Sequence, residues 1–444
     1  MKKTFIISLL VSLLYSNIQI PGEPQKGYLA LVNGFIHTVT NGDIENGQIL
    51  IKDGKIIDLG KEIKIPENSV IIDLKGNHVY PGFIDANSII GLIEISSIEA
   101  TLDYAEVLDF NPNVRAEVAI NPDSELLPVT RANGILISNV VPQGGIITGS
   151  SSVIMLDGWT NEDMVLKSIS GIHLKWPSKK EFSYRFYMRP KSEEELLKEY
   201  EEKVKKIKEF FEDAYSYLKA KYSDKKLSEV YDTDERFEAM VPLLKGEIPL
   251  FIHADEYYEV RDALDFFGNF KNLKLILVGG YDSWRLAYEL KSKNIPVIIT
   301  GIHTNPVRED EPYDEPFTLP YKLYKEGVKF CIAGSGSAFS ASNARNLPYK
   351  VSTACAFGLP LEEGIKSITI YAAEILGISD RVGSIEKGKD ATLIVTDGNP
   401  LDIKTNVLMA FIQGKKVDLE SKHTLLFKKY LKKYKISGFI SDTP

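Results

Sequence analysis

The chain has 444 residues, of which 44% are hydrophobic and 26% are charged, a composition typical of folded globular proteins. Its formal net charge of −8 argues against a basic nucleic-acid-binding surface. The length fits two structural units better than three. The two cysteines, Cys331 and Cys355, lie in apolar contexts, which favours buried free thiols and leaves one disulfide open.

The N-terminus begins with a basic Met-Lys-Lys and continues with an apolar run at residues 4–15, the pattern of a secretory signal. A membrane-spanning helix needs about 20 apolar residues, so this run is short for a span. We therefore expect residues 1–22 to be a signal peptide and the chain to be exported to the periplasm or the cell exterior. An uncleaved membrane anchor is the alternative, and no later segment predicts a stable membrane span.

Residues 27–79 read as short strands separated by turns. Asp53-Gly54 lies between two alternating runs and strongly predicts a hairpin, and Asn33-Gly34 predicts another turn. We expect several antiparallel strands and no helix here. Residues 383–417 again read as short strands separated by turns, with a hairpin-like segment at Gln413-Gly414. The two β-rich ends are predicted to pair into one small domain of residues 27–80 and 383–417.

Residues 81–382 alternate short apolar strands with helices. The expected strands are 134–141, 152–156, 169–175, 249–253, 273–278, 295–301 and 328–333, and the expected helices include 191–226, 256–267, 283–292, 347–357 and 361–376. Such alternation implies parallel strands with right-handed crossovers. The number of units fits a (β/α)8 barrel better than an open sheet. Residues 142–150 predict a Gly-rich loop, and residues 418–444 a C-terminal helix and tail.

Three groups of residues carry a resemblance to the imidazolonepropionase-like group of the amidohydrolase superfamily. They are residues 80–85 (Tyr-Pro-Gly-Phe-Ile-Asp), residues 251–255 (Phe-Ile-His-Ala-Asp) and a run at 369–401 that opens T-x-x-x-A-x-x-L-G. The resemblance covers roughly residues 27–417. It implies an α/β fold in which a distorted TIM barrel is inserted in a small composite β-sandwich domain. It also implies a hydrolase that acts on non-peptide C–N bonds of a small molecule, commonly as a homo-oligomer.

In this family one or two metal ions, often zinc, activate a water molecule. The resemblance implies five ligands after strands 1, 5, 6 and 8, at positions that hold Asn87, Ile89, His253, Gly279 and either Gly334 or Ser335. Only the histidine is retained, and a catalytic zinc needs about three protein ligands. We therefore expect a degenerate metal site with no metal bound, although zinc or another divalent metal is what the family would use. Lys175 resembles a carboxylated family lysine but has no second metal to bridge.

Several other polar residues follow the predicted strands and are candidates for the site. His253 and Ser335 are the candidate catalytic residues, as a base and a nucleophile that face one barrel mouth. The candidate substrate-binding residues are Asn87, Asp255, Gly279, His303 and Arg115. A rebuilt metal site would use His253 and His303, together with Asp255.

These candidates also have structural interpretations. His253 would be a hydrogen-bonded residue of the barrel mouth, His303 a loop residue, Ser335 part of a tight loop and Arg115 one member of an ion pair. Two functional hypotheses follow. The chain is a hydrolase by family with altered chemistry, or it is a pseudoenzyme that binds a small-molecule ligand or serves as a scaffold.

Overall fold

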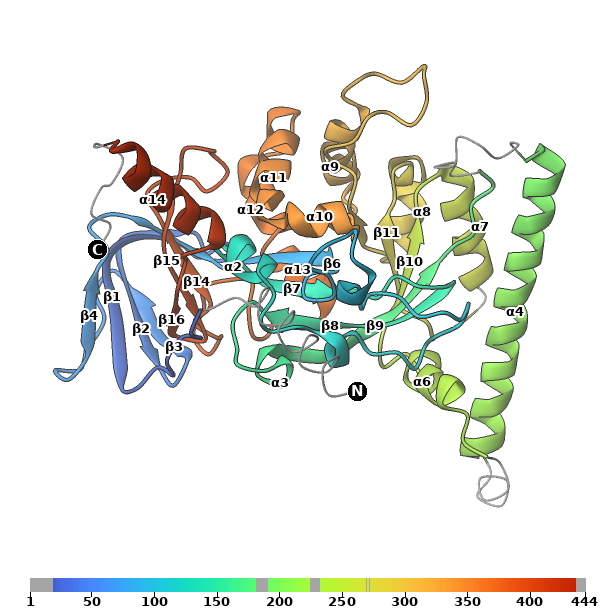
Figure 1. Cartoon of the computed structure of the whole chain (residues 1–444), viewed down its shortest axis with the longest axis horizontal. Helices are drawn as coiled ribbons and strands as arrows, with labels where there is room; N and C mark the ends of the chain where they lie inside the picture. Colours follow the sequence, from blue (N-terminus) through green and yellow to red (C-terminus); the bar gives the residue numbers. More distant parts are fainter. Residues whose placement is uncertain (1–18, 181–190, 224–231, 269, 271, 437–444) are drawn as a thin grey trace.

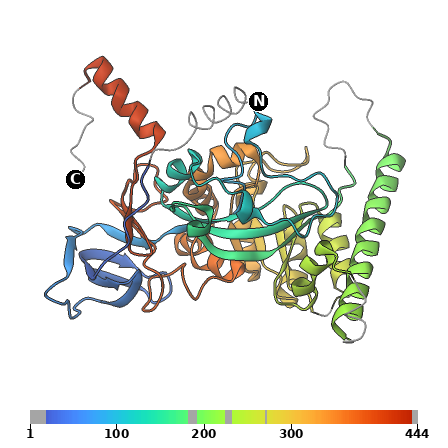
Figure 2. The same cartoon turned by 60° about the horizontal axis from the view of Figure 1, so that its bottom comes forward.

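The structure is a computed structural model that describes residues 19–180, 191–223, 232–268, 270 and 272–436. The predicted signal peptide falls almost entirely outside these residues. Two eight-stranded sheets organise the described chain. In Figures 1 and 2 the sheet built from the two chain ends lies on one side of the barrel, and the long helix α4 (Glu193–Ser223) stands on the other.

The first sheet combines strands from both ends of the chain. Its strands are β1 (Tyr28–His37), β2 (Asp43–Lys52), β3 (Lys55–Gly60), β4 (Val70–Asp73), β5 (His78–Pro81), β14 (Leu393–Thr396), β15 (Val407–Ile412) and β16 (Lys415–Val417). The pairing of β14 with β5 brings the two β-rich ends together. Both predicted hairpins are confirmed, because Asp53, Gly54, Gln413 and Gly414 have positive φ angles in the β2–β3 and β15–β16 turns.

Two expectations for this sheet were wrong. Asn33-Gly34 does not turn the chain, since β1 continues through it with a register shift between Leu31 and Gly34. The reason is that Asn33 alone adopts φ 57°, which accommodates a bulge instead of reversing the strand. The sheet is also mixed, because β1 pairs in parallel with β4 and β5.

The second sheet forms the barrel and follows chain order. Its strands are β6 (Phe83–Ser88), β7 (Ile135–Val140), β8 (Ile147–Met155), β9 (Val165–Lys175), β10 (Leu250–Ala254), β11 (Leu275–Gly279), β12 (Val297–Ile299) and β13 (Phe330–Ile332). The predicted α/β fold, a distorted TIM barrel with an added sheet, is confirmed. Apolar side chains from all eight strands fill one continuous core.

One strand departs from the predicted parallel arrangement. β8 pairs antiparallel with both β7 and β9. The physical reason is the short connection of residues 141–146 between β7 and β8, because a parallel crossover needs a dozen or more residues. The end of the predicted Gly-rich loop, from Ile147, therefore belongs to β8.

Helices and 3-10 turns complete the barrel. They are η1 (Glu99–Thr101), η2 (Ala116–Ala119), α2 (Leu126–Arg131), α3 (Asn161–Met164), α4, α6 (Glu235–Leu244), α7 (Tyr257–Phe267), η3 (Ser283–Leu286), α8 (Ala287–Ser292), α9 (Glu315–Glu326), α10 (Ala338–Ser342), η4 (Ala344–Asn346), α11 (Leu347–Ala356), α12 (Leu361–Ser367), α13 (Ile370–Leu376) and α14 (Lys422–Tyr434). The predicted helix at 361–376 is divided at Thr369, whose ψ of −100° is not helical. Both cysteines are free. Among the described residues, no helix is long and apolar enough to span a membrane.

The barrel closes through side chains of β6. Asp85 accepts a hydrogen bond from the Gly334 amide at 2.7 Å, and Asn87 donates from Nδ2 to the Gly334 carbonyl at 3.0 Å. Both side chains are buried. A Cβ at Gly334 would lie 2.9 Å from the Asn87 carbonyl oxygen and 3.0 Å from Asp85 Oδ2. A glycine is therefore needed where the first and last strands of the barrel approach each other.

A buried arginine fastens the barrel to the C-terminal strands. Arg131, at the end of α2, donates to Asp157 Oδ1 at 2.9 Å, to the Leu156 carbonyl at 2.6 Å and to the Asp418 carbonyl at 2.9 Å. The side chains of Arg131 and Asp157 are only 5% and 4% exposed. The Arg131 side chain thus joins α2 to the segment after β8 through Asp157, and to the segment after β16 through the Asp418 carbonyl.

Removing Arg131 should destabilise the protein strongly, because Asp157 would remain as a buried, unpaired charge. We expect Arg131→Leu to lower the free energy of unfolding by about 3–5 kcal/mol, measured by urea denaturation. The double variant Arg131→Leu/Asp157→Leu should lose less than the single variant. As a control, Lys206→Gln breaks an exposed ion pair with Asp109 and should change stability by less than about 1 kcal/mol. A loss of less than about 1 kcal/mol for Arg131→Leu would contradict a stabilising role for the buried Arg131–Asp157 ion pair.

Candidate functional site at the barrel mouth

The neighbouring parallel strands β9 and β10 end in polar residues. In their register His253 lies opposite Lys175, and Phe251 lies opposite His173. Since side chains alternate along a strand, His173 and Lys175 share one face of β9, and Phe251, His253 and the following Asp255 share one face of β10. His173 stacks on Phe251 with ring centroids 4.3 Å apart. The alternation therefore gathers these groups where the two strands end.

His253 is a neutral hydrogen-bonded imidazole. Its Nε2 lies 2.8 Å from Nδ1 of His173. Burial, with a smaller contribution from the charge of Lys175, lowers the pKa of His253 to about 3. Burial likewise holds the pKa of His173 well below its usual value. Near neutral pH both rings are uncharged, so His253 can accept or donate a hydrogen bond without carrying a positive charge.

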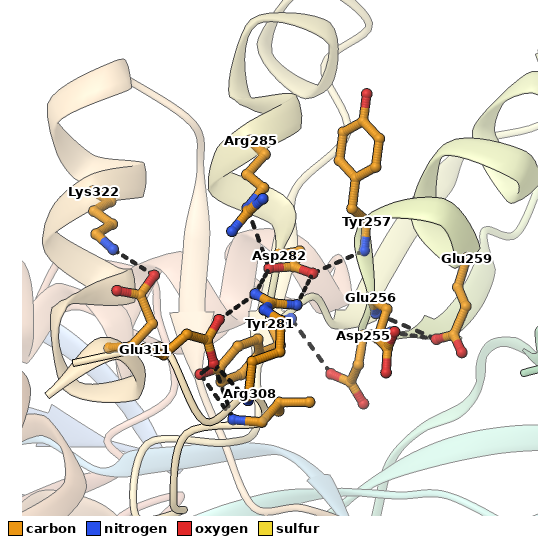
Figure 3. Close-up of polar contacts among 12 residues, drawn as sticks. Asp255, Glu256, Tyr257, Glu259, Tyr281, Asp282, Arg285, Arg308, Glu311 and Lys322 are labelled. Atoms are coloured by element: carbon orange, nitrogen blue, oxygen red, sulfur yellow. Dashed lines mark hydrogen bonds and ion pairs between the residues drawn. The ribbon is translucent and has the colours of Figure 1, made fainter. Parts of the chain in front are cut away.

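Asp255 is the carboxylate at the same strand end. Asp255 is exposed to solvent, yet many protein atoms lie around its carboxylate. Their desolvation of the charged carboxylate raises its pKa to about 6. The carboxylates of Glu259, Glu256 and Asp282 contribute to the shift, and a long 3.4 Å hydrogen bond from the Tyr281 amide opposes it. Figure 3 shows this contact. A group that titrates near neutral pH at a strand end is suited to proton transfer.

Gly279, at the end of β11, provides the space that Asp255 occupies. A Cβ at position 279 would lie 2.5 Å from Asp255 Oδ1, and the φ of Gly279 is +95°. Both facts exclude a larger side chain without rearrangement. The resemblance implies a histidine ligand here, and a histidine at this position would collide with Asp255 as it is placed.

Asp282 follows on the same loop but serves as a structural anchor. Arg308 donates to both of its oxygens at 2.9 and 2.6 Å, and the Tyr257 amide donates at 3.0 Å (Figure 3). Burial opposes ionisation of Asp282, yet the Arg308 and Tyr257 hydrogen bonds hold its pKa below the usual value. Arg308 also pairs with Glu311, which accepts from the Tyr281 hydroxyl at 2.9 Å. This network fixes the loops after β11 and β12.

Asn87 contributes to the barrel closure and retains one open hydrogen-bonding position. Its Nδ2 is used by the Gly334 carbonyl. Its Oδ1 is buried and has no hydrogen-bond partner among the described residues. A buried carbonyl oxygen without a donor is costly, so a water molecule or a ligand would be stabilised beside it.

Two lysines lie near the strand ends: Lys350 was not predicted there, and Lys175 was considered only as the counterpart of a carboxylated family lysine. Lys175 donates from Nζ to the Gln143 carbonyl at 2.6 Å, and Lys350, on α11, donates to the Ala333 carbonyl at 3.2 Å. Burial lowers the pKa of both amines, and the Asp85 carboxylate opposes the shift at Lys350. The shared face of residues 173 and 175 on a strand is the sequence signal that would have indicated Lys175.

The remaining candidates lie apart from this group. His303 is exposed, with its Nε2 2.8 Å from Thr353 Oγ1. Ser335 is exposed, with its Oγ 2.9 Å from Ser337 Oγ, and the described hydrogen bonds do not join it to His253. Arg115 is half-exposed and pairs with Glu117 at 3.4 Å. The proposed Ser–His pair is therefore not assembled in this conformation.

The residues present do not fit the metal cluster that the resemblance implies. Within the described ranges, no three His, Cys, Asp or Glu side chains lie close enough together to hold a metal ion. His253 already uses Nε2 toward His173. His253 and His303 are accordingly not brought into a common ligand set.

Comparisons with known proteins give consistent relatives. A family described as the Amidohydrolase family matches residues 317–424. The imidazolonepropionase of Caldanaerobacter subterraneus subsp. tengcongensis is 24% identical over 379 residues, covering 81% of this chain and 86% of that protein. Amidohydrolase tasK of Hapsidospora irregularis is 19% identical over 394 residues, 83% of this chain. The chain spans only 39% of the length of tasK.

A solved structure extends the similarity across the fold. The amidohydrolase of Thermotoga maritima MSB8 superposes with a TM-score of 0.77 at 25% sequence identity, covering 88% of this chain and 99% of that one. The match includes the barrel and the added sheet, since it covers most of both chains. Together with the family match and the curated relatives, it shows that this chain is similar to amidohydrolase-superfamily proteins over most of its length.

Proposed function

We propose that the protein is a hydrolase that cleaves a non-peptide C–N bond in a small amide-like molecule at the barrel mouth. The observation that carries this proposal is Asp255, whose pKa of about 6 suits it to exchange protons near neutral pH. Relatives named imidazolonepropionase and amidohydrolase support the reaction class. Lys175 and His253 lie opposite each other on the neighbouring strands β9 and β10, and they supply a cation and a neutral imidazole at the same barrel mouth.

The proposed reaction uses Asp255 first as a base and then as an acid. Its carboxylate takes a proton from water while the water oxygen bonds to the carbonyl carbon of the substrate. The negative charge that develops on the carbonyl oxygen is stabilised by the Lys175 ammonium. When the C–N bond breaks, Asp255 returns the proton to the leaving nitrogen. No step requires a metal ion, in keeping with the replaced ligands.

A second candidate function is a pseudoenzyme that binds a small molecule without converting it. The absence of a three-ligand group among the described residues favours this alternative. We also propose that the protein is exported to the periplasm or the cell exterior, from the basic and apolar start of the sequence. Assembly into homo-oligomers, as is common in the family, stays a proposal.

Turnover should survive metal removal. Purified full-length protein, treated with a chelator and checked by elemental analysis, should hydrolyse members of a panel of N-acyl amino acids and cyclic amides. Stoichiometric, tightly bound zinc would contradict the metal-independent reaction. Absence of turnover across the panel, with a saturable thermal shift from one of its members, would support the ligand-binding alternative.

The pH dependence should report Asp255. If Asp255 is the base, kcat/KM rises as the pH increases through about 6 and then levels off, because the carboxylate must be ionised to accept a proton. Asp255→Asn should lower kcat/KM by about 100-fold or more and remove this rise. Asp213→Asn, an exposed carboxylate on α4, is the matched control and should keep the wild-type profile. An unchanged profile in Asp255→Asn would exclude Asp255 as the base.

The same substitution should stabilise the fold at neutral pH. A raised pKa means that the folded chain keeps the Asp255 proton to a higher pH than the unfolded chain does. Stability is therefore lost as the pH rises from 3.8 to about 6. Because the asparagine side chain carries no charge, the variant should melt about 2 °C higher than wild type at pH 7 and equally at about pH 3. A lower melting temperature at pH 7 would contradict the strained carboxylate.

A further inference from the structure

A continuous chain of hydrogen bonds crosses the barrel interior behind His253. It joins His253 Nε2 to His173 Nδ1 (2.8 Å), His173 Nε2 to Ser151 Oγ (2.7 Å), Ser151 Oγ to Ser170 Oγ (2.5 Å), Ser170 Oγ to Asn139 Oδ1 (2.6 Å) and Asn139 Nδ2 to the Ala86 carbonyl (3.2 Å). The side chains between His253 and Ala86 belong to residues that are 0% exposed. Solvent therefore does not compete for these hydrogen bonds.

The fixed end of this chain sets the direction of each hydrogen bond. Only the amide nitrogen of Asn139 can donate to the Ala86 carbonyl, so the amide oxygen accepts from Ser170. Ser170 has then used its single proton and must accept from Ser151. Ser151 in turn must accept from Nε2 of His173. The order of protons follows from the chemistry of the groups.

The same order continues to the barrel mouth. His173 carries its proton on Nε2, and the ring is fully buried with no carboxylate among its hydrogen-bond partners, so its Nδ1 accepts. His253 must then donate from Nε2, which leaves no proton on its own Nδ1. Among the described residues, Nδ1 of His253 has no hydrogen-bond partner, and it is not one of the buried unpaired atoms. It is therefore open at the mouth.

We infer that His173, Ser151, Ser170 and Asn139 are positioning residues that hold His253 as the Nε2–H tautomer and present its Nδ1 as a hydrogen-bond acceptor. This inference rests on the proposed function only in placing the substrate at the barrel mouth. An acceptor beside the Lys175 cation suits a substrate with an N–H donor next to a carbonyl oxygen. The substrate class is therefore a secondary or cyclic amide, and N-methylation of the cleaved amide should weaken its use.

The tautomer can be read without any substrate. The full-length protein, labelled with ¹⁵N-histidine, has six histidines, and a His253→Gln spectrum identifies the His253 signals by difference. We expect one protonated nitrogen at Nε2 and one unprotonated nitrogen at Nδ1. A proton on Nδ1 in the wild-type protein would overturn the inference, even if every variant of the buried chain failed to fold.

Replacing Ser151, which contacts His173 in the chain of hydrogen bonds, should change which ring nitrogen of His253 carries the proton. Ser151→Ala removes the acceptor of His173 Nε2–H, which favours the other tautomer of His173 and leaves it donating from Nδ1. His253 Nε2 must then accept, so its proton should move to Nδ1, and kcat/KM should fall by about 100-fold. Unchanged ¹⁵N signals of His253 in folded Ser151→Ala would overturn the inference that this chain of hydrogen bonds sets the His253 tautomer.

Ser152→Ala is the matched control. Ser152 is buried on the same strand, but its hydroxyl donates to the Ser168 carbonyl at 2.5 Å and takes no part in the relay. Its ¹⁵N spectrum should equal that of wild type, and a change at His253 would contradict the assigned path. A correct tautomer in a protein that shows no hydrolysis would sink the proposed function alone and leave the relay standing.

Discussion

The barrel depends on the place where its first and last strands meet. β6 and β13 are the two edges of the second sheet, and side chains of β6 replace the missing ladder between them. Asp85 accepts the Gly334 amide in a fully buried position, where burial raises its pKa and the Gly334 hydrogen bond opposes that rise. Because the two edge strands approach so closely, position 334 admits only glycine. The closure of the barrel therefore limits which residue can occupy position 334 at the barrel mouth.

The same reasoning applies to three of the four positions that depart from the family pattern. Gly334 is required by the approach of β6, and Gly279 is required by Asp255. Asn87 fits its place because its amide spans the gap to Gly334. At positions 279 and 334 an added Cβ would collide with Asp255 and with the Asn87 carbonyl oxygen, respectively. A larger side chain placed at 279 or 334 alone would therefore clash with its neighbours.

Sequence patterns predicted the elements whose signals are local. The Asp53-Gly54 hairpin, the long charged helix and the family motifs were visible because their causes lie within a few residues. The direction of β8 was missed, since alternation of apolar residues is the same in either direction. His253 and Asp255 were found because they end a familiar strand, although their roles stay predictions. His173, Ser151 and Asn139 were not, because the contacts that define them join residues 22 to 80 positions apart.

The antiparallel β8 has a consequence for the order of folding. β7, β8 and β9 form a meander whose strands are joined by short connections, so they can pair early at a small cost in chain entropy. The barrel closure is the opposite case, because Asp85 and Gly334 are 249 residues apart. We expect the meander to act as a local nucleus on which the later strands assemble, and closure to come last. The buried residues of the hydrogen-bond chain on β7, β8 and β9 would then be in place before the barrel closes.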